Sequence, residues 1–440
     1  MAAPSQGFSL YSKSFHSRVP SKHSFQTSFR RNPFGLKVKA CQNPKKEDIL
    51  IVGAGIAGLA TALSLHRLGI KSLVLEQAGS LRIGGTSMTL FKNGWRVLDT
   101  LGVADDLRRQ FGEVTGMTIK TESGRELRSF QFKDEAFSQE VRGVERRVLL
   151  EMIARELPQD AICFSSRVST IDKTMSGETL VVLDDGRQIP TKVLIGCDGV
   201  QSPVAKWMGF SEPRYVGQCA FRGLGEYQTG HSFEPKVNYI YGSGLRAGYV
   251  PLSSTKVYWF ICFNNPFPGP RTSDPTLLKK EALQLVQSWP QELLDIIEKT
   301  PDEGVIKTPL VDRWLWPLVS PPGSAHGLAL AGDAWHPMTP NLGQGACCAL
   351  EDAIVLSRNL AKALEVNGFG GSSVDQALEA YTRERWGRVF PLAVRSNLVG
   401  SLLQWENGVG CFLRDNVVVP KLVRLGPLLE HTNYDCGTLQ

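Results

Sequence analysis

The fold of this chain is decided by one short stretch, which reads Asp48-Ile49-Leu50-Ile51-Val52-Gly53-Ala54-Gly55-Ile56-Ala57-Gly58. The apolar run at 48–52 predicts a buried parallel strand. Residues 57–68 repeat apolar side chains at helical spacing and end at Gly69, which predicts a helix. A second apolar strand is predicted at 72–76. Together these segments make one βαβ unit, so we expect an α/β fold with a parallel sheet.

The glycines of this turn have the spacing of a dinucleotide-binding motif. Gly53 permits the tight turn, Gly55 lets the backbone approach a pyrophosphate, and Gly58 lets the helix pack closely on the strand. The N-terminus of the helix offers free N–H groups and a positive dipole to the phosphates. Glu76 follows Gly53 by 23 residues and can accept hydrogen bonds from both ribose hydroxyls. We therefore predict a cofactor site at Gly53, Ala54, Gly55, Ile56, Ala57, Gly58 and Glu76.

A second glycine motif favours FAD over NAD as this dinucleotide. The apolar run 328–331 predicts another buried strand, and Gly332 and Asp333 follow it directly. Asp333 can bind a ribityl hydroxyl of the cofactor. The backbone at Gly343 and Gly345 can bring N–H groups beside the flavin pyrimidine ring, where negative charge develops on reduction.

A third motif, Asp198-Gly199, follows the predicted strand 192–196. It either contributes to the cofactor site or is a structural turn in which Asp198 bonds the backbone.

Composition and charge exclude several classes of protein. The 440 residues are 42% hydrophobic and 21% charged, as in ordinary globular enzymes. The body of the chain, residues 41–440, has a net charge of −1 within a total of +6, so we expect no nucleic-acid partner. The nine cysteines lack CxxC spacing, which favours free thiols and no metal site. We expect no transmembrane segment, because no run of 18 apolar residues occurs.

Residues 1–40 predict a cleavable transit peptide. They contain eight Ser and seven Lys or Arg, with no Asp or Glu. Val38-Lys39-Ala40-Cys41 resembles the loose cleavage context of chloroplast leaders. We expect a chloroplast location; a mitochondrial location and a merely disordered tail are the alternatives.

The rest of the chain predicts interleaved domains. Residues 215–263 hold several aromatic, β-branched strands, which indicate a mainly antiparallel sheet. We expect a Rossmann-type FAD-binding domain at 47–210 and 311–390, a substrate-binding β-sheet domain at 211–310, and a C-terminal helical region at 391–440. Apolar residues of that last region either pack on the body or make peripheral contact with a membrane.

The three motifs, in this order, resemble those of the flavoprotein monooxygenases typified by para-hydroxybenzoate hydroxylase and salicylate hydroxylase. Residues 47–390 are most similar to plant monooxygenases related to zeaxanthin epoxidase. The resemblance implies FAD as cofactor, with NAD(P)H and O2 as co-substrates. It also implies hydroxylation or epoxidation of an aromatic or isoprenoid small molecule through a flavin hydroperoxide. The alternatives are another FAD-dependent oxidoreductase of this fold, such as a reductase or halogenase, and a flavin-binding protein without turnover.

The resemblance further implies roles for single residues. Arg147 matches the helical arginine that contacts FAD in relatives, and Arg146 is the competing choice. Asp198 and Gly199 belong to a motif that serves both FAD and NAD(P)H, but Ala205 stands where the family has an arginine, with Lys206 beside it. Pro340, Gly343 and Gly345 would lie near the isoalloxazine. The candidate catalytic residues are Arg222, His336 and Pro340. The candidates to line the substrate site are Arg222, Tyr239, Tyr241, Tyr249, Tyr258 and Trp259.

Overall fold

A six-stranded sheet is built around strand β1 (Ile49–Val52), whose four residues are all buried. The strand order is β17-β18-β11-β1-β2-β7. β1 pairs in parallel with β2 and β11, and β11 pairs in parallel with β18. The other strands of this sheet are β2 (Leu73–Leu75), β7 (Ile162–Cys163), β11 (Val193–Gly196), β17 (Ser324–Ala325) and β18 (Leu328–Leu330). The predicted α/β fold with a parallel sheet is confirmed.

The computed structural model describes residues 46–81, 87–135, 139–269 and 274–440. These residues all belong to the unit Val38–Gln440. The predicted transit peptide at 1–40 and its cleavage context lie outside the described residues. Within the described ranges, no helix is both long and apolar enough to pass through a bilayer.

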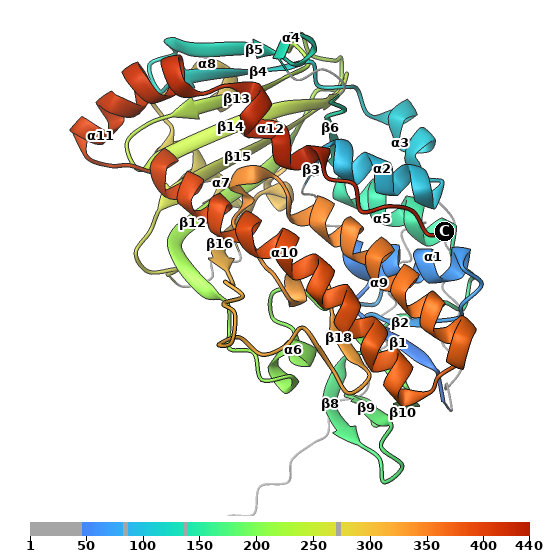
Figure 1. The fold of residues 1–440 in the computed structure, drawn as a ribbon. Coiled ribbons are helices and arrows are strands. Elements are labelled where there is room, and N and C mark those ends of the chain that lie inside the picture. Colours follow the sequence, from blue (N-terminus) through green and yellow to red (C-terminus); the bar gives the residue numbers. More distant parts are fainter. Residues whose placement is uncertain (1–45, 82–86, 136–138, 270–273) are drawn as a thin grey trace, which may run out of the picture. The chain divides into compact units, whose positions relative to one another are not determined.

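Long helices pack beside this sheet. Helix α1 (Ile56–Arg67) follows β1 and contacts α5 (Arg146–Arg155) and α9 (Gly345–Asn367). Helix α9 in turn lies between α1 and α10 (Gly371–Leu403), as Figure 1 shows. The Gly332–Gly345 loop enters α9 directly, so this packing also positions the second glycine motif.

A seven-stranded sheet forms the other half of the described fold. Its order is β16-β12-β15-β14-β13-β4-β5, and every pairing is antiparallel except β13 with β4. The strands are β4 (Gly116–Thr121), β5 (Glu126–Gln131), β12 (Arg214–Glu226), β13 (Lys236–Tyr241), β14 (Leu245–Ser253), β15 (Lys256–Asn264) and β16 (Ile306–Asp312). One face of this sheet packs on α7 (Pro275–Leu285) and α8 (Gln291–Glu298). The expected antiparallel sheet is therefore present.

The seven-stranded sheet includes two strands from an earlier part of the chain. Strands β4 and β5 fall within 47–210, which was expected to belong wholly to the cofactor domain, but they extend the seven-stranded sheet. The physical reason is that β13 would otherwise present an unpaired edge, and β4 covers it with main-chain hydrogen bonds. The domain division itself stays a prediction.

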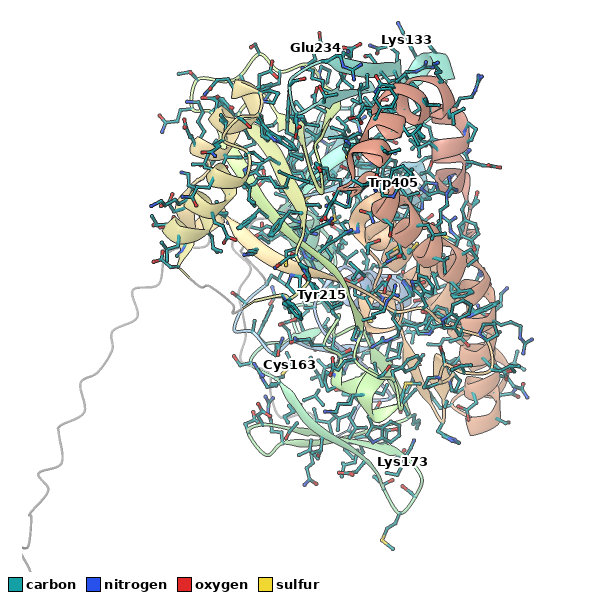
Figure 2. All side chains as sticks on the ribbon, turned by 90° about the vertical axis from the view of Figure 1, so that its left-hand side faces the viewer. Lys133, Cys163, Lys173, Tyr215, Glu234 and Trp405 are labelled. Carbon is teal, nitrogen blue, oxygen red and sulfur yellow. The ribbon has the colours of Figure 1, made fainter. Side chains whose placement is uncertain are left out.

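Smaller elements complete the fold. Strands β8 (Val168–Lys173), β9 (Thr179–Leu183) and β10 (Gln188–Thr191) form a separate sheet, at the lower end of which Figure 2 labels Lys173. Strands β3 (Ser87–Leu90) and β6 (Arg142–Glu145) pair with each other. The short helices are α2 (Lys92–Leu101), α3 (Ala104–Gln110), α4 (Phe132–Glu135) and α6 (Pro203–Trp207), with 3-10 turns η1 (Asp302–Gly304), η2 (Gly332–Ala334) and η3 (Pro340–Leu342).

The C-terminal region is helical, as expected, and packs on the seven-stranded sheet. After α10 come α11 (Gly408–Leu413), a π-helix η4 (Arg414–Leu422), α12 (Leu425–Leu429) and a 3-10 turn η5 (Glu430–Asn433). Trp405, labelled in Figure 2, marks the junction, where its carbonyl accepts a hydrogen bond from the Gly244 amide at 2.9 Å. Arg128 Nη1 of β5 donates to the carbonyl of Pro420 at 2.9 Å.

Candidate functional site

One cavity of about 510 Å³ joins the glycine turn after β1 to the seven-stranded sheet. At the turn it is lined by Gly55, Ile56, Ala57, Arg146, Gly199 and Asp333. At the sheet it is lined by Arg222, Tyr239, Tyr241, Arg246, Tyr258 and Phe260. The loop 338–343, which includes Pro340 and Gly343, runs along the cavity between these two ends. Its volume falls within the range of small-molecule and cofactor sites.

The three motif glycines are required for different physical reasons. Gly53 has φ +102°, and a Cβ there would lie 2.6 Å from the Cys197 carbonyl oxygen. A Cβ on Gly58 would collide with the Gly53 carbonyl oxygen. A Cβ on Gly55, in contrast, would face open cavity, with Arg146 Nη2 as its nearest neighbour at 3.9 Å. The protein's own packing therefore explains Gly53 and Gly58, whereas Gly55 leaves room for a ligand to approach the N-terminus of α1.

Glu76 holds this turn from the end of β2. Its carboxylate accepts hydrogen bonds from the amide of Ala54 at 2.8 Å and from the amide of Ala78 at 2.9 Å. The predicted carboxylate therefore stands beside the glycine turn and supports it.

The choice of Arg147 over Arg146 does not agree with the structure. Arg146 lines the cavity opposite Gly55, whereas Arg147 Nε binds Glu151 at 2.8 Å on the same helix and does not reach the cavity. The two residues are one position apart on α5, so their side chains differ by about 100° in direction. Of the two, Arg146 is the arginine that lines the cavity beside Gly55.

The two residues of the Asp198-Gly199 motif have different roles: Asp198 bonds the backbone, and Gly199 faces the cavity. Asp198 Oδ2 accepts from the Val204 amide at 3.3 Å and so supports the start of α6, while Gly199 lines the cavity. Burial raises the pKa of Asp198 to about 6. Ala205 is buried inside α6 and Lys206 is exposed. Ala205, which stands where the family has an arginine, therefore points into the protein.

The second glycine motif brings Asp333 to the cavity. Gly332 has φ +59°, and its amide donates to Asp352 Oδ2 at 2.8 Å, which fixes the turn. Asp333 is exposed toward the cavity, and Gly343 and Gly345 line it further along. Gly345 is the first residue of α9, so the positive end of that helix dipole faces this part of the site.

His336 is not placed for acid–base catalysis. It is 1% exposed and does not line the cavity. Its Nε2 lies 2.6 Å from Asp352 Oδ2, which also binds the Gly332 amide. The expected catalytic candidate is therefore a structural residue beneath the Asp333 turn, while the other two candidates, Arg222 and Pro340, do line the cavity.

The aromatic candidates lie on two different faces of the seven-stranded sheet. Tyr239, Tyr241 and Tyr258 line the cavity. Tyr249 and Trp259 lie on the opposite face, where the Tyr249 hydroxyl is 3.2 Å from Glu292 and the Trp259 indole donates to Thr300 at 2.8 Å. Successive residues of a strand point to opposite faces, so Tyr258 and Trp259 cannot both reach one cavity.

Two features of the site were not expected from the sequence. Arg246 of β14 lines the cavity although only 3% of its surface is exposed. The C-terminal region covers the cavity with apolar side chains, namely Val399, Leu402, Leu403, Val418, Val419, Val423, Leu428 and Leu429. The apolar spacing at 398–429 was the available signal for the second feature, but it does not say which surface those residues cover.

Comparison with known proteins agrees with this geometry. A sequence profile of the FAD binding domain matches residues 46–287 and 322–393. "Monooxygenase 2" of Arabidopsis thaliana is 36% identical over 403 residues, covering 89% of this chain and 98% of that protein. "Zeaxanthin epoxidase, chloroplastic" of Nicotiana plumbaginifolia is 28% identical over 391 residues, covering 83% of this chain and 57% of that protein. HpxO of Klebsiella pneumoniae, solved with FAD and uric acid, has the same fold, with a TM-score of 0.74, 22% identity, and coverage of 90% of this chain and 98% of that one.

Proposed function

Because this chain belongs to the FAD-dependent monooxygenases that share the FAD binding domain, we propose that it uses NAD(P)H and O2 to hydroxylate or epoxidise an aromatic or isoprenoid small molecule. The observation that carries the proposal is a continuous cavity that runs from Gly55 to the aromatic face of the seven-stranded sheet. A dinucleotide held at the glycine turn would thereby extend its flavin toward a substrate at the sheet.

The residues present fit FAD. The amides at the start of α1 and Arg146 would hold the pyrophosphate, Glu76 the adenosine ribose, and Asp333 the ribityl chain. Pro340, Gly343 and Gly345 would lie against the isoalloxazine. When bound, FAD supplies the redox chemistry that takes electrons from NAD(P)H and activates O2.

The chain itself would provide three things. The N-terminus of α9 at Gly345 stabilises negative charge on the ring that it faces. The apolar C-terminal residues that cover the cavity, such as Leu402 and Val419, exclude water from it. The aromatic wall formed by Tyr239, Tyr258 and Phe260 orients a flat substrate.

The purified full-length protein is expected to be yellow and to release FAD, not FMN, because the glycine turn and Glu76 suit a cofactor that has a pyrophosphate and an adenosine ribose. Anaerobic addition of NADH or NADPH should then bleach the flavin absorbance. Chromatography that identifies FMN would contradict the site assignment. A flavin that neither nucleotide reduces would contradict the proposed co-substrate.

We also propose that the protein acts in the chloroplast. The support is the basic, Ser-rich composition of residues 1–40, together with the chloroplastic zeaxanthin epoxidases among its relatives. A fusion of residues 1–46 to a fluorescent protein should enter plastids in plant cells. Fluorescence confined to the cytosol or to mitochondria would refute this location.

A further inference from the structure

Helix α11, at the outer edge of the ribbon in Figure 1, presents an apolar face to solvent. Val409, Phe412 and Leu413 are 72%, 63% and 44% exposed. They are spaced by three and four residues, so the three side chains lie on one face of the helix. A surface helix ordinarily carries polar side chains on its outer face. Packing among the described residues therefore does not explain the outer face of α11.

The opposite side of this helix is fixed to the body of the protein by Arg414, which directly follows it. Arg414 is 1% exposed, and its Nη1 donates to the carbonyls of Gly242 at 2.8 Å and Leu403 at 3.2 Å. Its Nε and Nη2 bind the carboxylate of Asp415 at 2.7 and 3.1 Å. These contacts hold α11 in one orientation, so the exposure of its apolar face is a property of the fold.

The segment that continues α11 is apolar on two sides. Val418 and Val419 of η4, and Val423 after it, line the cavity and keep water from it. Leu422, in contrast, is 65% exposed. A helical segment that is apolar on more than one side is ordinarily buried. We therefore expect the solvent side of this segment to be covered as well, by something that the described residues do not include.

Two exposed cations stand beside Leu422. Lys421 and Arg424 are both exposed, and no carboxylate of the described residues forms an ion pair with either. From Asn416 to Leu429 the sequence contains no acidic residue. Residues 41–440 as a whole have a net charge of −1, so this local excess of positive charge differs from the average of the body.

Two further arginines reach the same segment from neighbouring elements. Arg128 of β5 donates to the carbonyl of Pro420 at 2.9 Å, and Arg395 of α10 donates to the carbonyl of Pro427 at 3.1 Å. In the described part of the chain, neither arginine forms an ion pair. A carbonyl oxygen is a neutral acceptor, so both guanidinium charges stay unbalanced. The segment therefore combines exposed apolar side chains with a positive potential that attracts an anionic surface.

The size and composition of this face favour a membrane over a protein partner. A stable protein interface takes about 800 Å² and about 20–30 residues from each side, and lysine is depleted at its core. Here four large apolar side chains are exposed on 408–422, with a lysine and an arginine beside them. An aliphatic and aromatic helix face flanked by Lys and Arg is typical of helices that insert about 5–10 Å into the headgroup boundary.

We propose that this protein binds peripherally to an anionic lipid bilayer through a docking face on its C-terminal region. The apolar side chains insert among the headgroups, and the two exposed cations contact the lipid phosphates. Docking in this way places the apolar cover of the cavity next to the bilayer. The inference does not depend on the proposed function, since it requires neither FAD chemistry nor a particular substrate. The docking face consists of Val409, Phe412, Leu413, Lys421, Leu422 and Arg424.

Sedimentation with lipid vesicles tests this proposal on the full-length holoenzyme. One set of vesicles is phosphatidylcholine alone, and the other is phosphatidylcholine mixed with phosphatidylglycerol, which is anionic. We expect the wild type to sediment with the mixed vesicles and less with phosphatidylcholine alone. Added salt should weaken the binding to the mixed vesicles, because it screens the contacts between exposed cations and phosphates.

Phe412→Ser tests the apolar part of the docking face. It should weaken binding to the mixed vesicles by about tenfold or more, because serine cannot replace the buried phenyl surface. Phe267→Ser is the matched control: Phe267 is 80% exposed on the turn after β15 and should be dispensable. Val409→Ser, at the most exposed residue of the α11 face, provides the same test if Phe412→Ser has a lowered melting temperature or FAD content.

Lys421→Gln and Arg424→Gln test the charged part. Each should weaken binding to the mixed vesicles by about fivefold and leave binding to phosphatidylcholine unchanged. Lys280→Gln, at an exposed position of α7, is the control and should bind like the wild type. All variants keep residues 1–40, whose seven cations contribute equally to each, so this tail cannot produce a difference between them.

The proposal is overturned if the wild type does not sediment with the mixed vesicles, or if Phe412→Ser and Val409→Ser both bind as tightly as the wild type. Equal losses in Phe412→Ser and Phe267→Ser would also overturn it. Sedimentation velocity without lipid examines the other occupant. A wild type that self-associates, and that Phe412→Ser converts to a monomer, would assign the face to a second copy of the chain and refute the membrane.

Discussion

Replacing Arg385 by Met is expected to lower the free energy of unfolding by about 3–5 kcal/mol, because it removes the fully buried arginine that two buried carboxylates share. Arg385 of α10 is fully buried. Its Nε binds Asp352 at 2.7 Å, and its Nη2 binds Glu351 at 2.6 Å. Both carboxylates are also fully buried, and Arg388 Nη2 reaches Glu351 at 3.1 Å. Urea denaturation of the wild type and the variant measures the difference.

A matched control lies two residues away on the same helix. Arg383 pairs with Glu379 at 2.8 Å, but both side chains are mostly exposed. Exposed pairs contribute little, so Arg383→Met should change the stability by no more than about 0.5 kcal/mol. Equal losses in the two variants would show that the buried network does not hold α9 and α10 together.

The same network predicts a dependence on pH. Burial alone would raise the pKa of Asp352, but His336 and Arg385 hold it at about 2. Because the folded-state pKa is lower than the ordinary value of about 4, the ion pair stabilises the protein above that pH. Its contribution should be lost as the pH falls from about 4 to about 2, and the difference between wild type and Arg385→Met should narrow over that range. A difference that stays constant there would contradict the assignment to Asp352.

Gly55→Val is expected to give a folded protein that retains almost no FAD. A Cβ added at Gly55 would have Arg146 Nη2 as its nearest neighbour, at 3.9 Å, and the branched side chain of valine would extend into the space expected for the pyrophosphate. Gly53 and Gly58 would be poorer test sites, since a side chain at either collides with the protein's own backbone. The ratio of flavin to protein absorbance in the purified variant measures the loss.

Gly112→Val is the control for that variant. Gly112 lies outside the cavity, lacks a positive φ, and has no atom within 4 Å of an added Cβ. It should keep its FAD. Stoichiometric FAD in Gly55→Val, with a normal melting temperature, would mean that the glycine turn does not hold the cofactor.

The sequence was most informative where a local pattern determines the structure. The strand, glycine turn and helix at 48–68 follow from local spacing, and the structure has β1 and α1 there. Asp333, after the second apolar run, also lies in the cavity. These features depend on neighbouring residues in the chain, so the sequence alone was enough to predict them.

The errors arise where one residue's direction decides the outcome. Arg146 and Arg147 are equally compatible with a helix, and the start of α5 determines which one faces Gly55. Tyr258 and Trp259 are both aromatic, but side chains alternate along β15, so only Tyr258 faces the cavity. His336 closely follows the glycine motif, but its ring is buried against Asp352, which lies 16 residues later and shares a hydrogen bond with it.

The presence of Arg246 in the cavity could not be predicted from the spacing of residues in the sequence. It depends on the pairing of β14 with β15 and on a contact with Asn341, 95 residues away in the chain. The same is true of the C-terminal cover, since Val418 and Val419 reach the cavity only because η4 packs back on β5. Long-range packing, and not local propensity, determines these parts of the site.

Monooxygenation itself is tested most directly by the fate of molecular oxygen. The holoenzyme is incubated with NADH or NADPH, isotopically labelled O2, and the ligand that most stimulates nucleotide oxidation, and the product is analysed by mass spectrometry. We expect one labelled oxygen atom in each product molecule, with none taken from labelled water. A product that carries no label from O2, or nucleotide oxidation that yields only hydrogen peroxide with every ligand, would contradict it.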